Sequence, residues 1–346
     1  MTSPLTRDLV VRTPLMSTRL APRAMLVQAI IVTLCAGLAL ASINLGSYEV
    51  SPREVFGVLI GAEDGLLRMV VLEWRLPRIV AAVLFGALLG ISGAVFQSLT
   101  RNPLGSPDII GFNSGAFSGV VVALLFGAVT YAALTVGAII GGLITAAVVY
   151  AVSFRRGVSG FRFIIVGIAV GAFLSSMNSW FSVRADVDSA LRAAVWGAGS
   201  LGLATWTTLG VAAGIAAVVA VVTPMAQRSL ELLELGDDAA SALGLPVEWS
   251  KVGLIVLGTL TTAAVTASAG PIAFVALAAP HIARRLAGRG SSVDLVSSAA
   301  VGALLLLVSD IIAQYAIPGA SLPVGAVTVS LGGVYLMYLL IIEARR

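Results

Sequence analysis

The stretch from Arg75 to Ala116, RLPRIVAAVLFGALLGISGAVFQSLTRNPLGSPDIIGFNSGA, decides how this chain folds. A charged entry that contains Pro77 leads into a long run of apolar and small residues. A polar loop with two prolines, Arg101 to Pro107, interrupts this run before a second glycine-rich apolar run begins. A membrane interior tolerates interrupted backbone only where protein shields it or where it lines a cavity. The stretch therefore predicts part of a path through a bilayer.

The whole chain has the composition of an integral membrane protein. Of its 346 residues, 58% are hydrophobic and 11% are charged, and the mean hydropathy is +1.02, whereas about a quarter of the residues in a soluble domain are charged. One cysteine and one histidine are too few for a disulfide framework or a His/Cys metal site. The single lysine, Lys251, does not follow a glycine-rich loop, so no phosphate-binding loop is present. No nucleophile–base pair can be assembled, and we expect a protein that is not an enzyme.

Runs of about twenty apolar residues predict ten membrane-spanning helices with both termini in the cytoplasm. The predicted spans are 24–43, 77–96, 109–127, 130–152, 162–182, 204–223, 252–268, 271–287, 294–314 and 324–342. This topology places fifteen basic residues inside and six outside, in agreement with the positive-inside rule. Such scattered arginines argue against a nucleic-acid surface. The inside set is Arg7, Arg12, Arg19, Arg23, Arg101, Arg155, Arg156, Arg162, Arg228, Lys251, Arg284, Arg285, Arg289, Arg345 and Arg346.

The chain divides into a cytoplasmic tail, residues 1–23, and a single transmembrane domain, residues 24–346. The arginines before the first apolar run favour a signal anchor, and a cleaved signal peptide is the alternative. We expect an external loop at 44–75 and a short, partly amphipathic external helix within 183–203. The largest internal loop, 224–251, is acidic, which predicts a protein partner inside the cell.

Polar groups at two places along the predicted spans are candidates for function. Arg75 and Arg78 stand three residues apart outside the second span, where they point the same way on a helix. They either grip carboxylates of an external partner or extend to the membrane interface. The turn Asn102-Pro103-Leu104, followed by Pro107, predicts either a constriction at the cytoplasmic mouth or a tight interhelical turn.

Small and polar residues mark the helix interiors. The glycines Gly86, Gly90 and Gly93, like Gly111, Gly115 and Gly119, recur at helical spacing, which favours close helix packing. The fifth span carries a dense polar cluster that predicts the wall of a watery path or a set of interhelical hydrogen bonds. The cluster consists of Ser175, Ser176, Asn178 and Ser179.

Two titratable residues support a rival hypothesis, a proton-coupled secondary transporter. Asp310 is an intramembrane carboxyl near the external end of the ninth span, which makes it a functional candidate. A buried structural partner or a helix cap is the alternative for this residue. His281 follows Pro280 near an internal helix end, where a local capping role is favoured over proton relay.

The internal loop contains a second pattern, Leu230-Glu231-Leu232-Leu233-Glu234-Leu235-Gly236-Asp237-Asp238-Ala239-Ala240-Ser241-Ala242-Leu243-Gly244-Leu245. It predicts two short helical pieces, broken at Gly236 and stopped at Gly244, with leucines on one face and acids on the other. Such a pair suits docking into a groove of another protein. Its acids would be repelled by anionic lipid, so docking is favoured over lying on the membrane.

Taken together, these motifs resemble the permease subunits of ATP-driven importers for iron–siderophore complexes and vitamin B12, the FecCD type. The resemblance runs from about residue 70 to the C-terminus on RLPR, SGAVFQSLTRNPLGSP, ELGDDAASALGL, AGPIAFVALAAPHIARR and LPVGAVTVSLGG. Within the family, RNPLGSPDIIGFNSGAFSG, APHIARR and LPVGAVTVSLGGVYL are most similar to the G-type permease subunits of ferric-enterobactin importers. The N-terminal forty residues add nothing to this resemblance.

The resemblance implies a type II importer permease fold and an assembly in the bacterial inner membrane. Two permease subunits, here two different paralogues, enclose a cavity that alternates its access. A binding lipoprotein or periplasmic protein delivers the ferric siderophore, of an enterobactin-like kind. Two separate ATPase subunits bind ATP and magnesium, and this chain itself holds no cofactor. A permease for vitamin B12 or haem of the same family is the alternative cargo class.

The resemblance also implies roles for residues of this sequence. Arg75 and Arg78 match arginines that receive acidic residues of the binding protein. Asn102, Pro103 and Leu104 match the turn that narrows the cytoplasmic exit. Many family members have an arginine where this chain has Gln314, so one docking contact is missing here, which favours a heterodimer. The segment that matches the ATPase-coupling helices includes Leu235, Gly236, Asp237, Asp238, Ala240, Leu243 and Gly244.

Overall fold

The computed structural model describes residues 9–12, 17–20, 22–46, 48–127, 130–154, 160–288 and 294–344. Most of the predicted N-terminal tail lies outside this part of the chain. So do six of the basic residues in the topology argument, namely Arg7, Arg155, Arg156, Arg289, Arg345 and Arg346.

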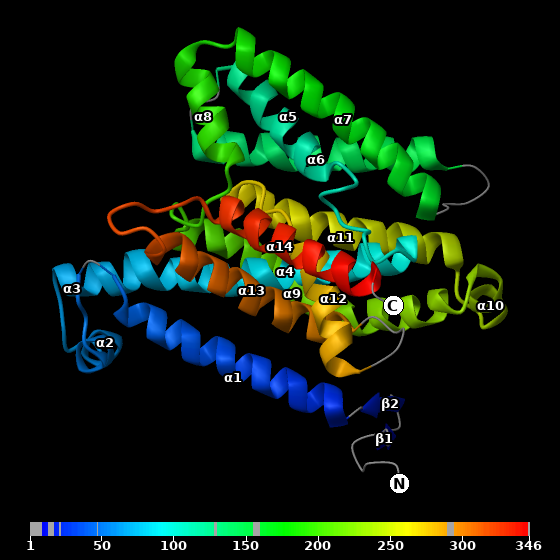
Figure 1. Cartoon of the computed structure of the whole chain (residues 1–346), viewed down its shortest axis with the longest axis horizontal. Coiled ribbons are helices and arrows are strands. Elements are labelled where there is room, and N and C mark those ends of the chain that lie inside the picture. Colours follow the sequence, from blue (N-terminus) through cyan, green and yellow to red (C-terminus); the bar gives the residue numbers. More distant parts are fainter. Residues whose placement is uncertain are drawn as a thin grey trace.

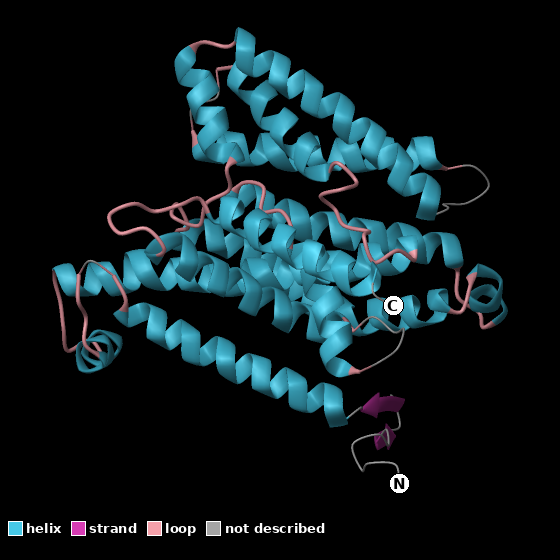
Figure 2. Cartoon of the chain, viewed as in Figure 1, coloured by secondary structure: helices cyan, strands magenta, loops and turns pink. Residues whose placement is uncertain are grey.

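The described chain is built from α-helices, with one short antiparallel hairpin near its start (Figure 2). The hairpin pairs β1 (Leu9–Arg12) with β2 (Ser17–Leu20). Ten helices correspond to the ten predicted spans: α1 (Pro22–Asn44), α4 (Leu76–Thr100), α5 (Phe112–Leu125), α6 (Tyr131–Ser153), α7 (Gly160–Arg184), α9 (Trp206–Glu234), α11 (Val247–Ala269), α12 (Val275–Ala287), α13 (Leu295–Tyr315) and α14 (Val324–Ala344). The shorter helices are α2 (Pro52–Leu59), α3 (Leu66–Met69), α8 (Val187–Gly197) and α10 (Asp237–Ala242).

Seven of these helical segments are long and apolar enough to cross a membrane on their own, among the described residues. They are α1, α6, α7, α9, α11, α13 and the joined segment Leu66–Thr100 that contains α4. The apolar parts of α5 and α14 are shorter. The segment 271–287 was predicted to be a full span, but α12 covers only its last thirteen residues. Thirteen residues of helix rise about 20 Å, less than the roughly 30 Å hydrocarbon core.

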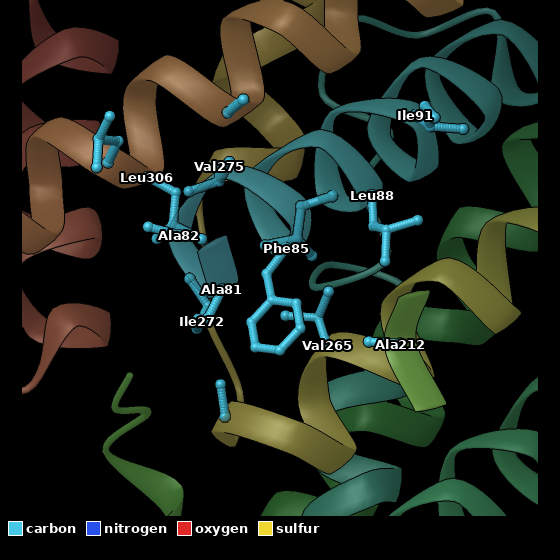
Figure 3. Close-up of a cluster of buried hydrophobic side chains, with 14 of the residues drawn as sticks. Ala81, Ala82, Phe85, Leu88, Ile91, Ala212, Val265, Ile272, Val275 and Leu306 are labelled. Atoms are coloured by element: carbon cyan, nitrogen blue, oxygen red, sulfur yellow. The ribbon is translucent and has the colours of Figure 1, made fainter. Parts of the chain in front are cut away.

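Helix α4 runs through the centre of the molecule, among α9, α11, α12 and α13 (Figure 1). In the most apolar windows of α4 and α11, 78% of the residues are buried, against 17% for α1 and α7. Phe85 and Leu88 of α4 meet Val265 of α11 in the main core cluster (Figure 3). The helices α5 to α8 pack together along one side of this core, and α1 lies along the opposite side (Figure 1). The outer helices therefore leave apolar faces for lipid or a partner subunit.

The glycine spacing of α4 has the packing role that the sequence predicted. A Cβ on Gly86, Gly90 or Gly93 would overlap a backbone oxygen of α13 or α12. A Cβ on Gly115 or Gly119 of α5 would likewise overlap atoms of α6. Only residues without a side chain let these helices approach so closely.

The predicted helix boundaries at Pro77 and Pro224 are wrong, because neither proline interrupts its helix. The second span was predicted to begin at Pro77, but helix runs unbroken from Leu66 through a π-helical segment, η2 (Val70–Arg75). The wider turn, with the N–H of Leu76 donating to the oxygen of Val71, lies just before the proline ring that would disturb a regular helix. The sixth span was predicted to end at 223, but α9 continues through Pro224 to Glu234.

The predicted external helix is present as α8, which begins after the capping residue Asp186. The hydrogen bonds that Ser189 donates hold the pKa of the Asp186 carboxyl below its ordinary value. Asp186 therefore stays ionised at the helix N-terminus, where a negative charge is favourable.

Candidate translocation site

An open cavity of about 490 Å³ lies between α5, α7, α8 and the segment that precedes α12. Most of the residues that line it are polar or small, and one of them is aromatic. Ser175 and Asn178, two of the four residues predicted for a translocation path, line it. The other lining residues are Asn113, Ser114, Phe117, Ala194, Gly197, Ala198 and Pro271.

The polar cluster of α7 divides into two pairs. Ser175 and Asn178 turn toward α5, where the Ser175 hydroxyl lies 3.0 Å from that of Ser114 and Asn178 donates to the Ser114 carbonyl at 3.2 Å. Ser176 and Ser179 instead donate to carbonyls of their own helix, one turn back. The interhelical hydrogen bonds that the sequence left as one alternative are therefore present for Ser175 and Asn178. The same two residues line the cavity, and their role in a translocation path stays a prediction.

Sequence reasoning missed the α5 side of this cavity and the residue that supports it. Asn113 donates to the carboxylate of Asp108 at 2.6 Å, and the backbone N–H of Phe274 donates to its other oxygen at 3.0 Å. Asp108 thereby ties the loop after α4 to the irregular segment 270–274 before α12, where Phe274 has a positive φ of 78°. The sequence does contain a signal for Asp108, because a carboxylate directly follows the second proline of the loop after α4.

The turn predicted for the cytoplasmic mouth is tight and partly exposed. The side-chain oxygen of Asn102 accepts a hydrogen bond from the N–H of Leu104 at 2.9 Å, and the N–H of Gly105 donates to the Asn102 carbonyl at 2.9 Å. Pro103 stands between them and Leu104 is 51% exposed. The turn follows Arg101, which caps α4 in a left-handed conformation with φ 49°.

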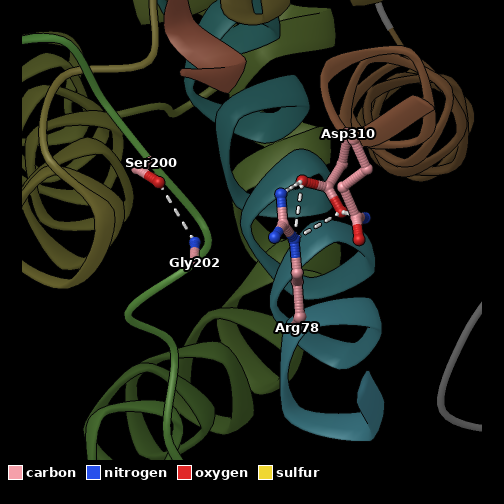
Figure 4. Close-up of polar contacts among 5 residues, drawn as sticks. Arg78, Ser200, Gly202 and Asp310 are labelled. Atoms are coloured by element: carbon pink, nitrogen blue, oxygen red, sulfur yellow. Dashed lines mark hydrogen bonds and ion pairs between the residues drawn. The ribbon is translucent and has the colours of Figure 1, made fainter. Parts of the chain in front are cut away.

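At the opposite end of α4, the predicted docking arginines are engaged inside the chain. Arg78 forms a bidentate ion pair with Asp310 of α13, through contacts of 2.8 to 3.1 Å (Figure 4). Arg75 donates to the carbonyl of Ile43 in the last turn of α1 and to that of Tyr48 in the loop that follows. Nη1 of Arg78 faces the loop near Gly202, where an added Cβ would lie 3.9 Å away.

Asp310 has the buried structural partner that the sequence left as one alternative. Gln314 also donates to it, at 2.8 Å. Gln314 lies in the last turn of α13. His281 was predicted to cap a helix end, but it lies inside α12 with its ring edge-on to Tyr335. The proton-coupled hypothesis is therefore not favoured.

The predicted two-piece internal segment is corrected in its first half. Residues 230–234 are the end of α9 and not a separate helix. The break at Gly236 and the stop at Gly244 are confirmed, with φ of 107° and 86°. The predicted separation of leucines from acids holds only in part, because Leu235 and Leu243 are 63% and 62% exposed while Ala240 is buried. Asp238 is exposed, and Asp237 accepts from Arg101 and Lys251.

These features define a multi-pass membrane protein with a cavity of mixed polar and apolar lining between helices and exposed segments at both ends of its central helix. The chain belongs to the FecCD transport family, whose sequence pattern matches residues 31–342. It is therefore a transport permease subunit by family, as the resemblance implied.

Relatives of known description agree with this family. The chain is 44% identical to the ferric enterobactin transport system permease protein FepG of Escherichia coli K12, over 94% of this chain and 98% of that protein. It is 33% identical to the hemin transport system permease protein HmuU of Yersinia pestis, over 94% and 98%. It is 32% identical to the iron(3+)-hydroxamate import system permease protein FhuG of Bacillus subtilis, over 92% and 97%.

A solved structure shares the fold. It is assigned to a metal-chelate type ABC transporter in an inward-facing conformation. It matches 92% of this chain and 99% of its own, with a TM-score of 0.82 and 28% identity. The all-helical permease fold predicted from the sequence is confirmed.

Proposed function

We propose that this chain is one of two permease subunits of an ATP-driven importer that moves ferric siderophores across a bacterial inner membrane. The observation that carries the proposal is the 44% identity to a ferric enterobactin permease along nearly the full length of both chains. An enterobactin-like catecholate complex is therefore the cargo that we expect. The lower identities to hemin and hydroxamate permeases leave those cargo classes as outcomes of the test.

The cavity chemistry suits passage rather than tight binding. The groups of Ser114, Ser175, Asn113 and Asn178 are neutral hydroxyls and amides, which can hydrogen-bond to oxygens of a catecholate complex. Conduction requires contacts that are favourable enough for entry and weak enough for release. We propose that these side chains form one wall of the path, and that the turn Asn102–Leu104 narrows its cytoplasmic exit.

The two sides of the molecule that face away from the membrane offer surfaces for the partners. Outside, Arg75 and Arg78 contribute positive charge for acidic residues of a binding protein. Inside, the segment from Leu235 to Gly244 presents exposed apolar side chains beside its acids, which suits a groove on an ATPase subunit. A second, different permease and two ATPases complete the proposed assembly, and ATP and magnesium are bound by the ATPases.

Uptake in cells tests the proposal. Deleting the gene for this chain should abolish accumulation of radioactive iron supplied as ferric enterobactin, and the restored gene should return it. Ferric hydroxamate, hemin and vitamin B12 are supplied in parallel to identify the cargo class. Uptake that persists without the ATPase and stops with an uncoupler would establish proton coupling and overturn the proposal.

A further inference from the structure

One carboxylate at the cytoplasmic end of the molecule holds two cations from different helices. Oδ1 of Asp237, the first residue of α10, lies 2.9 Å from Nη2 of Arg101. Its Oδ2 lies 2.6 Å from Nζ of Lys251 in α11. The partners are 136 and 14 residues away in the sequence. The triad Arg101–Asp237–Lys251 therefore joins the end of α4, the start of α10 and the start of α11.

Arg101 also bridges the break in the chain at Gly236. The same Nη2 donates to the carbonyl of Leu233 at 3.0 Å, so one guanidinium contacts residues on both sides of the glycine. Gly236 has a φ of 107° and empty space where a side chain would stand. Ala240 is the buried residue of the short helix that follows. Arg101 thus contacts the chain on both sides of the break between α9 and α10.

Arg101 has a backbone conformation that is unusual for a residue with a side chain. Its φ of 49° is a left-handed conformation that favours glycine at the end of a helix. An arginine at this position is less favourable for the backbone than a glycine, but it provides the guanidinium that contacts Leu233 and Asp237. Asn102, the next residue, begins the tight turn through Leu104. The group that holds α10 is therefore one residue away from the proposed gate.

Lys251 attaches this unit to the core of the protein. It is the single lysine of the chain, and its side chain is 8% exposed. It begins the buried part of α11, a helix whose most apolar window is as buried as that of α4. Asp237 and Arg101 are by contrast 46% and 53% exposed. Lys251 is thus the buried end of the triad, whereas Asp237 and Arg101 are accessible to water and to a partner.

We propose that Asp237 is a positioning residue that couples the segment Leu235–Gly244 to the turn Asn102–Leu104 through Arg101, so that the two move as one unit. This inference rests on the proposed function, which makes the first segment the ATPase contact and the second the exit. A displacement of α10 by an ATPase is passed to the gate turn through a charged contact rather than through the apolar core. Half-exposed ion pairs of this kind contribute little to stability, so loss of the pair should change coupling more than it changes the fold.

The first test measures coupling in the complete transporter. Asp237→Asn keeps the shape of the side chain and removes its charge, and Arg101→Gln removes one of its two cationic partners. Uptake per ATP should fall about five-fold in each variant, the low end of allosteric coupling, and Arg101→Gln should leave ATP hydrolysis and ATPase association intact, because Arg101 lies outside the segment Leu235–Gly244. Asp237→Glu, which keeps the charge, should recover most of the loss. Arg228→Gln is the matched control, because Arg228 is an exposed arginine of α9 at the same side of the membrane.

The second test measures the link in the chain itself. In a Cys35→Ala background, spin labels at Leu104→Cys and Leu243→Cys report the distance between the two segments, both of which are exposed. We expect one narrow distance distribution with and without ATP, and a broadened one after Asp237→Asn. Equal widths in the two backgrounds, or unchanged uptake per ATP, would overturn the proposal. Absence of any ATPase association with the unsubstituted chain would overturn the proposed function instead, and the label distances would still report the link.

Discussion

The two ends of α4 carry the same chemistry in different surroundings. At the outer end, Arg78 meets Asp310, with side chains that are 20% and 1% exposed. At the inner end, Arg101 meets Asp237, with 53% and 46% exposed. A buried pair is expensive to break because one charge is left without solvent, whereas an exposed pair exchanges its partner for water at little cost. The outer pair therefore fixes two helices, and the inner pair joins two exposed segments with little effect on stability.

Removal of the outer carboxylate should have the largest effect. In Asp310→Ala, the guanidinium of Arg78 and the amide of Gln314 lose their acceptor, and α4 loses its polar contact with α13. We expect the free energy of unfolding to fall by about 3 kcal/mol, the lower end for a broken buried pair because Arg78 is partly exposed. Denaturant unfolding of the purified protein in detergent measures this.

The matched control replaces both members of the pair. Arg78→Met combined with Asp310→Leu removes both charges and keeps apolar volume, so most of the lost stability should return. If Asp310→Ala is as stable as the unsubstituted protein, the outer pair is no anchor and the contrast between the two ends fails.

A smaller loss is expected midway along α4, where packing replaces charge. A Cβ added by Gly90→Ala would meet the backbone of Ser298 in α13, and overpacking of this kind costs about 2 kcal/mol. Gly253→Ala in α11 is the control, since nothing lies within 4 Å of the added carbon. Equal stability of the two variants in the same detergent assay would show that α4 and α13 adjust freely along their contact.

The third prediction concerns capture of the binding protein. Simple charge reversal of Arg78 would place a carboxylate against Asp310, so a loss of capture would mix docking with misfolding. The pair Arg78→Met and Asp310→Leu avoids this, and so does Arg75→Met, which frees two carbonyls near the surface. Arg75→Met should weaken binding by about 1 kcal/mol, roughly five-fold, whereas the double variant removes one charge of each sign and should weaken it less.

Salt dependence separates a charge contact from a packing contact in this assay. The loss caused by Arg75→Met should shrink as salt rises, because screening already weakens exposed charge contacts. Binding of the loaded protein is measured by surface immobilisation or titration at two salt concentrations. Unchanged affinity in both variants would show that the arginines serve only the internal contacts seen in the structure.

Sequence patterns predicted the features that depend on neighbours along the chain. The glycine spacing of α4, the helix α8 and the interruptions at Gly236 and Gly244 are all local, and the structure contains each of them. Ser175 and Asn178 were recognised because a polar cluster in an apolar helix is itself a local signal.

Contacts between distant residues could not be predicted in this way. Arg78 and Asp310 are 232 residues apart, and nothing in the periodicity of either helix pairs them. The contribution of Asn113 to the cavity depends on how α5 meets α7, which composition does not determine. The prolines at 77 and 224 misled for a related reason, because neighbouring helices and a wider turn can support a helix that would otherwise end.

The smallest stability effect should come from the inner pair, and this makes it the sharpest test of the comparison. In Asp237→Asn, the amide oxygen can still accept a hydrogen bond from Lys251, the buried partner, and Arg101 is 53% exposed to water. We expect the free energy of unfolding to change by less than about 1 kcal/mol, well below the change for Asp310→Ala. The same detergent assay gives both numbers. A loss at Asp237 as large as that at Asp310 would mean that Lys251, which is buried, makes the inner triad a second anchor, and the contrast between the two ends of α4 would fail.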